Sequence, residues 1–125
     1  MYPSIEVLYG SVLFVYMCAY YLGFLGGNMK HWLLAIIVLM NCSAYTHTGN
    51  PTASGVMPKE GMCAVDRING ITVPFGTKIT LPNGKILTVE DRFGANHDNR
   101  LDIFMESESA CWKFGRKMLK CEVEL

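Results

Sequence analysis

The chain has 125 residues, half of them hydrophobic, with eleven basic and eleven acidic side chains and a formal net charge of zero. This length allows one domain at most. The even charge balance lacks the basic footprint of a nucleic-acid-binding protein, so we expect no nucleic-acid partner.

The charged residues are distributed unevenly along the chain. Residues 1–44 contain only Glu6 and Lys30, and the other ten acids and ten bases fall in residues 45–125. We therefore divide the chain into an apolar leader, residues 1–44, and a soluble domain, residues 45–125. A domain of 81 residues buries only a modest core.

The leader contains two apolar segments. Residues 7–29 run 23 positions without a charge, and about 20 apolar residues cross a bilayer as a helix, so we expect a membrane helix over residues 7–28. Residues 29–44, "MKHWLLAIIVLMNCSA", have the basic start, apolar centre and small-residue end of a secretory signal peptide or anchor. Met29 is therefore an alternative start to Met1.

Both interpretations of the leader place residues 45–125 outside the cell membrane. If both segments insert, Lys30 lies in the loop between them, and the positive-inside rule keeps that loop cytoplasmic. If only the second segment acts, it exports the same domain. We expect a membrane-anchored or secreted protein. The competing interpretation is that both segments are core helices of a soluble protein.

The cysteines carry little information. An odd count in an exported domain leaves one thiol free or intermolecular, and three cysteines fall in residues 45–125. No CxxC or Cys/His spacing indicates zinc, so we expect no metal and no cofactor. The five cysteines are Cys18, Cys42, Cys63, Cys111 and Cys121.

The soluble domain has the sequence pattern of short strands separated by turns. Asn83-Gly84 after Pro82 lies between two alternating runs and predicts a hairpin, because asparagine and glycine tolerate positive φ. Alternation predicts strands at 62–66, 77–81, 85–90, 100–105 and 119–125, with a further short extended segment at 67–73. About six strands at this spacing predict a mainly all-β fold, a small barrel.

One short helix is predicted in "ESESACWKFGRK". Ser107 can cap its start, Glu108 suits its first turn and Gly115 suits its end. We expect Trp112 and Phe114 to pack as helix core. The alternative for Trp112 is an exposed ring that stacks on a sugar.

The segment "VEDRFGANHDNRLDIFM" contains Asp91 and Asp102, eleven residues apart. It is open to three interpretations: an acidic surface loop, a metal loop, or a pair of acids on neighbouring strands. A calcium loop would need the DxDxDG rhythm and a closing glutamate, which this stretch lacks. We expect His97 and Asp98 to form a solvated turn.

Six motifs taken together resemble a known family. Their order and spacing are similar to those of the bacterial three-aspartate (3D) domain, which is found in spore-forming bacteria and phages. That domain resembles the catalytic barrel of the A-type membrane-bound lytic transglycosylases. The motifs are TASG (52–55), AVD (64–66), VPFGT (73–77), VED (89–91), NRLDIF (99–104) and ACWKFG (110–115).

The resemblance implies a double-psi β-barrel that cleaves the glycan strands of peptidoglycan. The reaction is a non-hydrolytic cut of the β-1,4 bond between N-acetylmuramic acid and N-acetylglucosamine, which leaves a 1,6-anhydro sugar. The resemblance implies that Asp102 is the general acid/base, that Asp91 tunes it, and that Asp66 lines or supports the groove. The substrate-binding candidates that it implies are Thr52, Ser54, Gly94 and Arg100.

The chemistry explains why such a site needs carboxyl groups. The leaving oxygen must be protonated, and a carboxyl holds its proton near neutral pH only if burial or a second carboxylate raises its pKa. The same group, once ionised, can take the proton from the muramic 6-hydroxyl. No second, water-activating carboxylate is then required.

The chain also departs from the family pattern. The family commonly has Asp-Thr-Gly-Gly-Ala-Ile, whereas residues 91–96 read Asp-Arg-Phe-Gly-Ala-Asn, which places bulky Arg92 and Phe93 beside the expected acid. The second domain that full-length A-type enzymes use to hold the glycan is also missing from the pattern. Three alternatives follow from this: a homodimer, another partner, or slow and loose binding of the glycan.

Other roles for the domain stay open. It can be a non-catalytic glycan-binding or wall-loosening barrel, or the structural knob of a small phage membrane protein. Lys59, Arg67 and Arg92 are either solvated or contact the acidic peptide stems of peptidoglycan.

Overall fold

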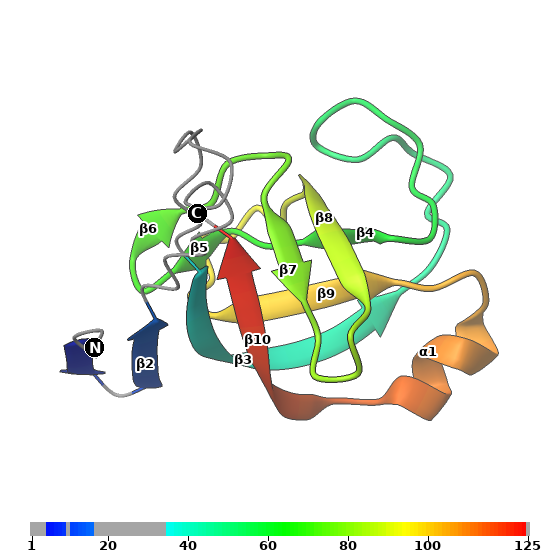
Figure 1. Ribbon diagram of the computed structural model, residues 1–125. Coiled ribbons are helices and arrows are strands. Elements are labelled where there is room, and N and C mark those ends of the chain that lie inside the picture. The colour runs from blue at the N-terminus through cyan, green and yellow to red at the C-terminus, as the bar shows by residue number, and fades with distance from the viewer. Residues whose placement is uncertain (1–4, 10, 17–34, 125) are drawn as a thin grey trace, which may run out of the picture.

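The computed structural model describes residues 5–9, 11–16 and 35–124, and these residues are mostly β structure (Figure 1). Its elements are β1 (Ile5–Tyr9), β2 (Ser11–Tyr16), β3 (Ala35–Tyr45), β4 (Met62–Ala64), β5 (Arg67–Ile68), β6 (Ile71–Thr72), β7 (Lys78–Thr80), β8 (Ile86–Asp91), β9 (Arg100–Phe104), α1 (Glu108–Phe114) and β10 (Lys117–Glu124).

Eight of the strands belong to one mixed sheet. Its order is β1-β2-β3-β10-β7-β8-β4-β9, and β5 pairs with β6 in a separate hairpin. An additional pairing of β3 with β9 joins the ends, so the strands from β3 to β9 in this order pair in a closed cycle of six. The β3–β9 and β4–β8 pairs are parallel and the other four are antiparallel. Each of the six therefore has a partner on both sides.

The core lies inside this cycle and is made of alternate residues of its strands. On β3, Val38, Met40 and Cys42 are fully buried, while the residues between them are half-buried. Other residues of the core cluster are Cys63, Val65, Ile79, Leu87, Val89, Leu101, Ile103, Cys121 and Val123. Three buried thiols thus belong to the core, and the four cysteines that the structure describes are free.

Strand β3 corrects the expected domain boundary. The sequence placed residues 35–44 in a signal peptide or anchor, whereas the structure places them in an eleven-residue strand paired with β10 along Ala35–Cys42 and with β9 along Asn41–Tyr45. A short apolar run fits a buried strand as well as a leader. The boundary predicted at residue 44 therefore falls inside the sheet. The rest of the predicted segment, residues 29–34, lies outside the described residues.

The membrane helix predicted over residues 7–28 also differs from the structure where the two can be compared. Residues 5–9 and 11–16 are the strands β1 and β2, which pair with each other, and β2 pairs with β3. The remainder of 7–28 lies outside the described residues. In the described part of the chain, no helix is long and apolar enough to span a bilayer.

The predicted local elements of residues 62–124 are confirmed. Strands β7 and β8 form the expected hairpin, with Gly84 at φ 89° in its turn. Helix α1 begins after Ser107, whose side chain accepts a hydrogen bond from the Ala110 N–H, and ends at Gly115, at φ 66°. The 67–73 segment is the β5–β6 hairpin.

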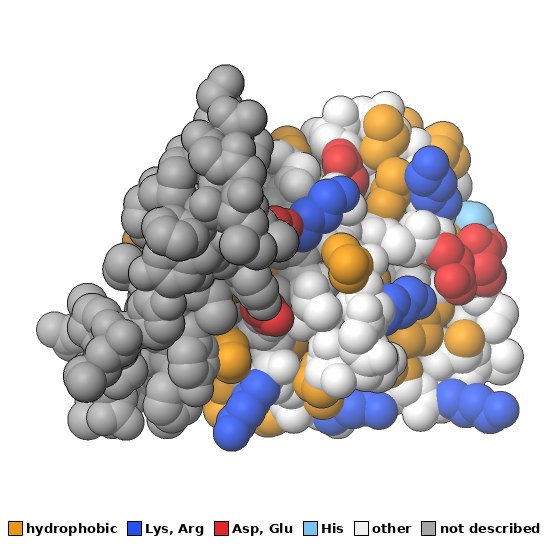
Figure 2. Space-filling view, in the orientation of Figure 1, with side chains coloured by type: hydrophobic (Ala, Val, Ile, Leu, Met, Phe, Trp, Pro, Cys, Tyr) orange, Lys and Arg blue, Asp and Glu red, His pale blue; other side chains and the backbone are white. Residues whose placement is uncertain are grey.

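The described surface has mixed charge. Figure 2 shows basic and acidic side chains interspersed with hydrophobic ones on the face turned to the viewer, as the even charge balance predicts.

Candidate functional site

Asp91 and Asp102 lie in one row across adjacent strands. Ala64 of β4 is the register partner of Asp91 on β8 and of Asp102 on β9. Asp102 is in turn the partner of Ser43 on β3. Partners in register carry their side chains on the same face of a sheet, so both carboxylates project on the side away from the core, with only a methyl group between them.

A β-bulge creates this alignment. Cys63 pairs with Val89, but the next residue, Ala64, pairs with Asp91, so Glu90 is passed over. A bulge shifts the side-chain alternation of its strand by one residue. The shift turns Asp91 onto the face opposite buried Val89 and brings it into line with Asp102.

Asp91 is held by three hydrogen bonds. Its Oδ1 accepts from the backbone N–H of Ala53 at 2.9 Å and of Arg92 at 2.8 Å. Its Oδ2 accepts from the Tyr45 hydroxyl at 3.3 Å. The carboxylate is therefore fixed in position between the 52–55 turn and β3.

Asp102 has the electrostatic character expected of a proton donor. Burial raises its pKa above the usual range, and the charge of Asp91 adds to this effect. The Ser43 hydroxyl, which donates to its Oδ1 at 2.9 Å, and the cations Arg100 and Arg116 only partly offset the increase. A carboxyl with a raised pKa holds its proton closer to neutral pH.

Tyr45 donates to Asp91 and also lies within the electrostatic influence of Asp102. Burial raises the pKa of its phenol, and the negative charges of Asp91 and Asp102 raise it further, so the hydroxyl stays protonated and donates to Asp91. Its ring packs edge-on against Phe104, with the centroids 5.6 Å apart. Tyr45 is thus held in place by the same strand pair that positions Asp102.

A pocket of about 500 Å³ lies beside this row, between the end of β3 and α1. It contains Ser43 and Tyr45, so each carboxylate accepts a hydrogen bond from a hydroxyl of a lining residue. Its lining residues are Ser43, Ala44, Tyr45, Thr46, Glu108, Cys111, Trp112, Gly115 and Arg116.

The position of Trp112 corrects the prediction that it packs as helix core. Its side chain is 83% exposed and lines the pocket. Phe114 on the same helix does pack against the core, half-buried. A seven-residue helix on the rim of a small domain has one face to bury, and Trp112 lies off that face.

Thr52 and Ser54 lie next to Asp91, and they shape the backbone there. Their hydroxyls are 3.0 Å apart, and Thr52 is buried. The Ser54 N–H donates to the Glu90 carbonyl at 3.1 Å. This turn presents the Ala53 N–H to the Asp91 carboxylate.

Asp66 lies apart from the pair, in a supporting role. It is 4% exposed, and its carboxylate accepts backbone N–H donors of Phe93 at 2.7 Å, Gly94 at 3.4 Å and His97 at 3.0 Å. Burial raises its pKa, but these donors, with that of Ala95, outweigh burial and hold the pKa below its usual range. Asp66 and Gly94 thus fix the loop that follows β8.

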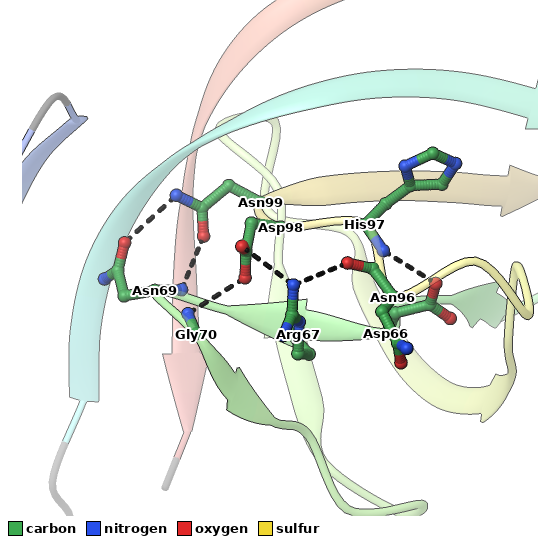
Figure 3. Close-up of polar contacts among 8 residues, drawn as sticks. All are labelled: Asp66, Arg67, Asn69, Gly70, Asn96, His97, Asp98 and Asn99. Atoms are coloured by element: carbon green, nitrogen blue, oxygen red, sulfur yellow. Dashed lines mark hydrogen bonds and ion pairs between the residues drawn. The ribbon is translucent and has the colours of Figure 1, made fainter.

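Figure 3 shows that His97 and Asp98 belong to a network that ties this loop to the β5–β6 hairpin. Arg67 donates to the Asn96 carbonyl at 2.7 Å and pairs with Asp98 at 3.1 Å. Asp98 also accepts the Gly70 N–H at 2.9 Å. Arg67 therefore has a structural partner, and the His97 ring points away from the network.

The two bulky residues after Asp91 point in different directions. Arg92 donates to the carbonyls of Val65 and Val73, and its guanidinium lies 4.1 Å from the centroid of the Phe75 ring. It therefore connects the segments that contain these residues. Phe93 packs under Arg100 at 5.0 Å. Arg100, two residues before Asp102 on β9, shares its face and lowers its pKa.

Sequence reasoning missed three residues of the site: Ser43, Tyr45 and Arg116. Ser43 and Tyr45 fall in or beside the segment interpreted as a leader, although the small and polar residues that alternate after Met40 are a strand pattern.

Among the described residues, no group of histidine, cysteine or acidic side chains has the arrangement of a metal site.

Comparison with known proteins gives no relative. No family model, curated protein or solved structure matches the chain.

Proposed function

We propose that the protein is a glycan-cleaving enzyme of the lytic transglycosylase type, with the closed six-stranded cycle forming a double-psi β-barrel. The observation that carries the proposal is the bulge-aligned pair of Asp91 and Asp102, each of which accepts a hydrogen bond from the hydroxyl of a residue that lines a pocket. The two parallel pairings within the cycle also support this barrel.

In this proposal, Asp102 is the general acid/base. Its proton passes to the oxygen of the β-1,4 bond as the bond to the muramic C1 breaks. The ionised carboxylate then accepts the proton of the 6-hydroxyl, whose oxygen bonds to C1 and closes the anhydro ring. Asp91, held by backbone donors and Tyr45, stays close enough to raise the pKa of Asp102 and to stabilise positive charge at C1.

The proposed substrate is the glycan strand of peptidoglycan, which places the working site outside the cell membrane. Export must then leave residues 35–45 with the domain, because β3 supplies Ser43 and Tyr45 and closes the cycle. The proposed export element is therefore confined to residues before 35.

The test uses the purified full-length chain with peptidoglycan sacculi. We expect anhydro-muropeptides, detected by mass spectrometry, from the wild type and from Glu90→Gln, a neighbouring acid that the bulge leaves out of the row. We expect none from Asp102→Asn. Equal release by wild type and Asp102→Asn would contradict the role of Asp102.

A second candidate function is glycan binding without cleavage. The exposed Trp112 beside the pocket favours it, because aromatic faces bind sugar rings in non-catalytic modules as well as in enzymes. Intact glycan together with protein that still pellets with sacculi would select this alternative.

A further inference from the structure

The pocket between β3 and α1 combines three features that together describe a ligand. It has about 500 Å³ of space, an exposed indole and a guanidinium on its wall. Pockets of roughly 300–1,000 Å³ hold ligands of the size of a disaccharide. A flat apolar face beside a cation fits a ring that carries an acidic substituent.

Trp112 has no packing role that explains its position. Its side chain is 83% exposed on a helix whose residues are at most half-buried. Burying an indole against a ligand gains far more than leaving it in water, which is why tryptophan is common at the centre of binding surfaces.

Arg116 is a cation without a structural partner. It has no ion pair and no hydrogen bond among the described residues, unlike Arg67 and Arg92, whose guanidinium groups hold loops together. It lies near enough to Asp102 to lower that carboxyl's pKa. A guanidinium binds a carboxylate through two parallel hydrogen bonds.

We propose that this pocket is a subsite for an amino sugar that bears a carboxylate, with Trp112 stacking on the ring and Arg116 pairing with the carboxylate. The inference deepens the proposed function, on which it rests for the class of ligand. In peptidoglycan the carboxylate can belong to the lactyl ether of a muramic residue without peptide or to the peptide stem. The subsite thus selects acidic glycans over neutral ones of the same length.

The experiment measures binding in the full-length Asp102→Asn protein, so that a cut does not remove the ligand. Three probes are titrated: the neutral tetramer of N-acetylglucosamine, a peptide-free tetrasaccharide of alternating muramic acid and glucosamine units, and the same tetrasaccharide with peptide stems. We expect at least one acidic probe to bind roughly tenfold more tightly than the neutral tetramer. The acidic probe that gains affinity identifies the source of the carboxylate.

Variants then assign the two contacts. We expect Arg116→Gln to abolish the preference for the acidic probe. We expect Trp112→Ala to lower the affinity for every probe that binds, by roughly tenfold. Lys113→Gln is the matched control, because Lys113 is an exposed cation that lies next to Trp112 on α1 and does not line the pocket. It should leave all affinities unchanged.

The outcomes also separate this inference from the reaction. Three binding outcomes would overturn the subsite. The protein with unchanged pocket residues could bind all three probes with equal affinity, it could bind none of them, or Trp112→Ala could leave the affinities unchanged. Anhydro products with both pocket variants at the wild-type rate would overturn it and leave the reaction intact. Selective binding without anhydro products would overturn the reaction and leave the subsite intact.

Discussion

At the scale of single residues, Asp66 and Asp102 have opposite electrostatic environments. Asp66 faces a set of backbone N–H donors, which favour its charged form. Burial disfavours the charged form of Asp102, the neighbouring Asp91 carboxylate adds to this effect, and the single hydroxyl donor of Ser43 offsets it only in part. The first arrangement stabilises a loop, and the second keeps a carboxyl protonated to higher pH, as the proposed reaction requires.

Replacement of Asp66 by asparagine should destabilise the protein. The amide cannot match the charge-assisted bonds to the 93–97 loop, and its NH₂ group opposes backbone donors, so we expect a loss of roughly 2–3 kcal/mol in the free energy of unfolding. Because the folded pKa is lowered, the wild-type advantage is present above the unfolded pKa of about 4 and is lost as the pH falls through the folded pKa. Urea titrations from pH 2 to pH 7 measure it, and a constant difference would contradict the assignment.

Replacement of Asp102 by asparagine should have the opposite effect. The folded pKa of Asp102 is raised, so the folded state binds more protons than the unfolded state, and wild-type stability falls as the pH rises from the unfolded pKa through the folded one. Asp102→Asn removes this loss, and Ser43 can still donate to its amide oxygen. We therefore expect a higher melting temperature for the variant at pH 7 and convergence near pH 3.

The same pKa direction sets the pH dependence of the proposed reaction. A general acid acts only while protonated, so turnover of sacculi should decline as the pH rises through the raised pKa of Asp102. Removal of the Tyr45 hydroxyl by Tyr45→Phe frees one lone pair of Asp91 and should shift this decline. Initial rates of anhydro-sugar release from pH 4 to pH 9 test both statements, and superimposable profiles would exclude a role for the hydroxyl.

At the scale of elements, β3 is the strand on which both the closed cycle and the pocket depend. It pairs with β2, β10 and β9, and it contributes both to the core and to the pocket. Its alternation of buried and half-buried residues is that of a strand with two occupied faces.

Matched substitutions on β3 should reveal this two-faced character. Met40 is fully buried, so Met40→Ala should cost about 2–5 kcal/mol in the free energy of unfolding. Leu39, the adjacent residue, is half-buried and lies opposite exposed Lys120, so Leu39→Ala should cost clearly less. Chemical denaturation measures the free energy of unfolding of both variants. An equal loss in the two would contradict the strand register.

The sequence predicted the local elements after residue 60 well, because turns and caps are local signals. Asn83-Gly84 marked the hairpin, and Ser107 and Gly115 marked the ends of the helix. It did not predict β3, because an apolar run of this length satisfies a leader and a buried strand equally. Nor did it predict the exposure of Trp112, which depends on where a short helix docks.

For the site, the sequence indicated Asp91 and Asp102 but not how they come together. Their alignment depends on a bulge that passes over Glu90, and no residue in "TVEDRF" marks that irregularity. The sequence did not indicate Ser43 and Tyr45, because a parallel pairing between strands distant in sequence places them beside the aspartates.

At the scale of the whole molecule, the cycle of strands closes through an N-terminal segment. A chain that begins at residue 45 lacks β3, so β9 and β10 each lose a partner. We expect it to be unfolded, whereas a chain that begins at residue 35 keeps the cycle. Amide hydrogen exchange of the two fragments tests this expectation, and a protected core in the shorter fragment would contradict it.

The bulge at Glu90 also has a consequence for how this gene can change. Loss of the single codon for Glu90 preserves the reading frame and the hydrophobic pattern before it, yet it removes the extra residue that separates Val89 from Asp91. The aspartate would then follow Val89 directly, pair with Ala64 in a regular ladder and keep its side chain on the outer face. A three-nucleotide deletion at this codon thus regularises the strand and still leaves both carboxylates in one row, so this position of the gene can lose a codon without losing the pair.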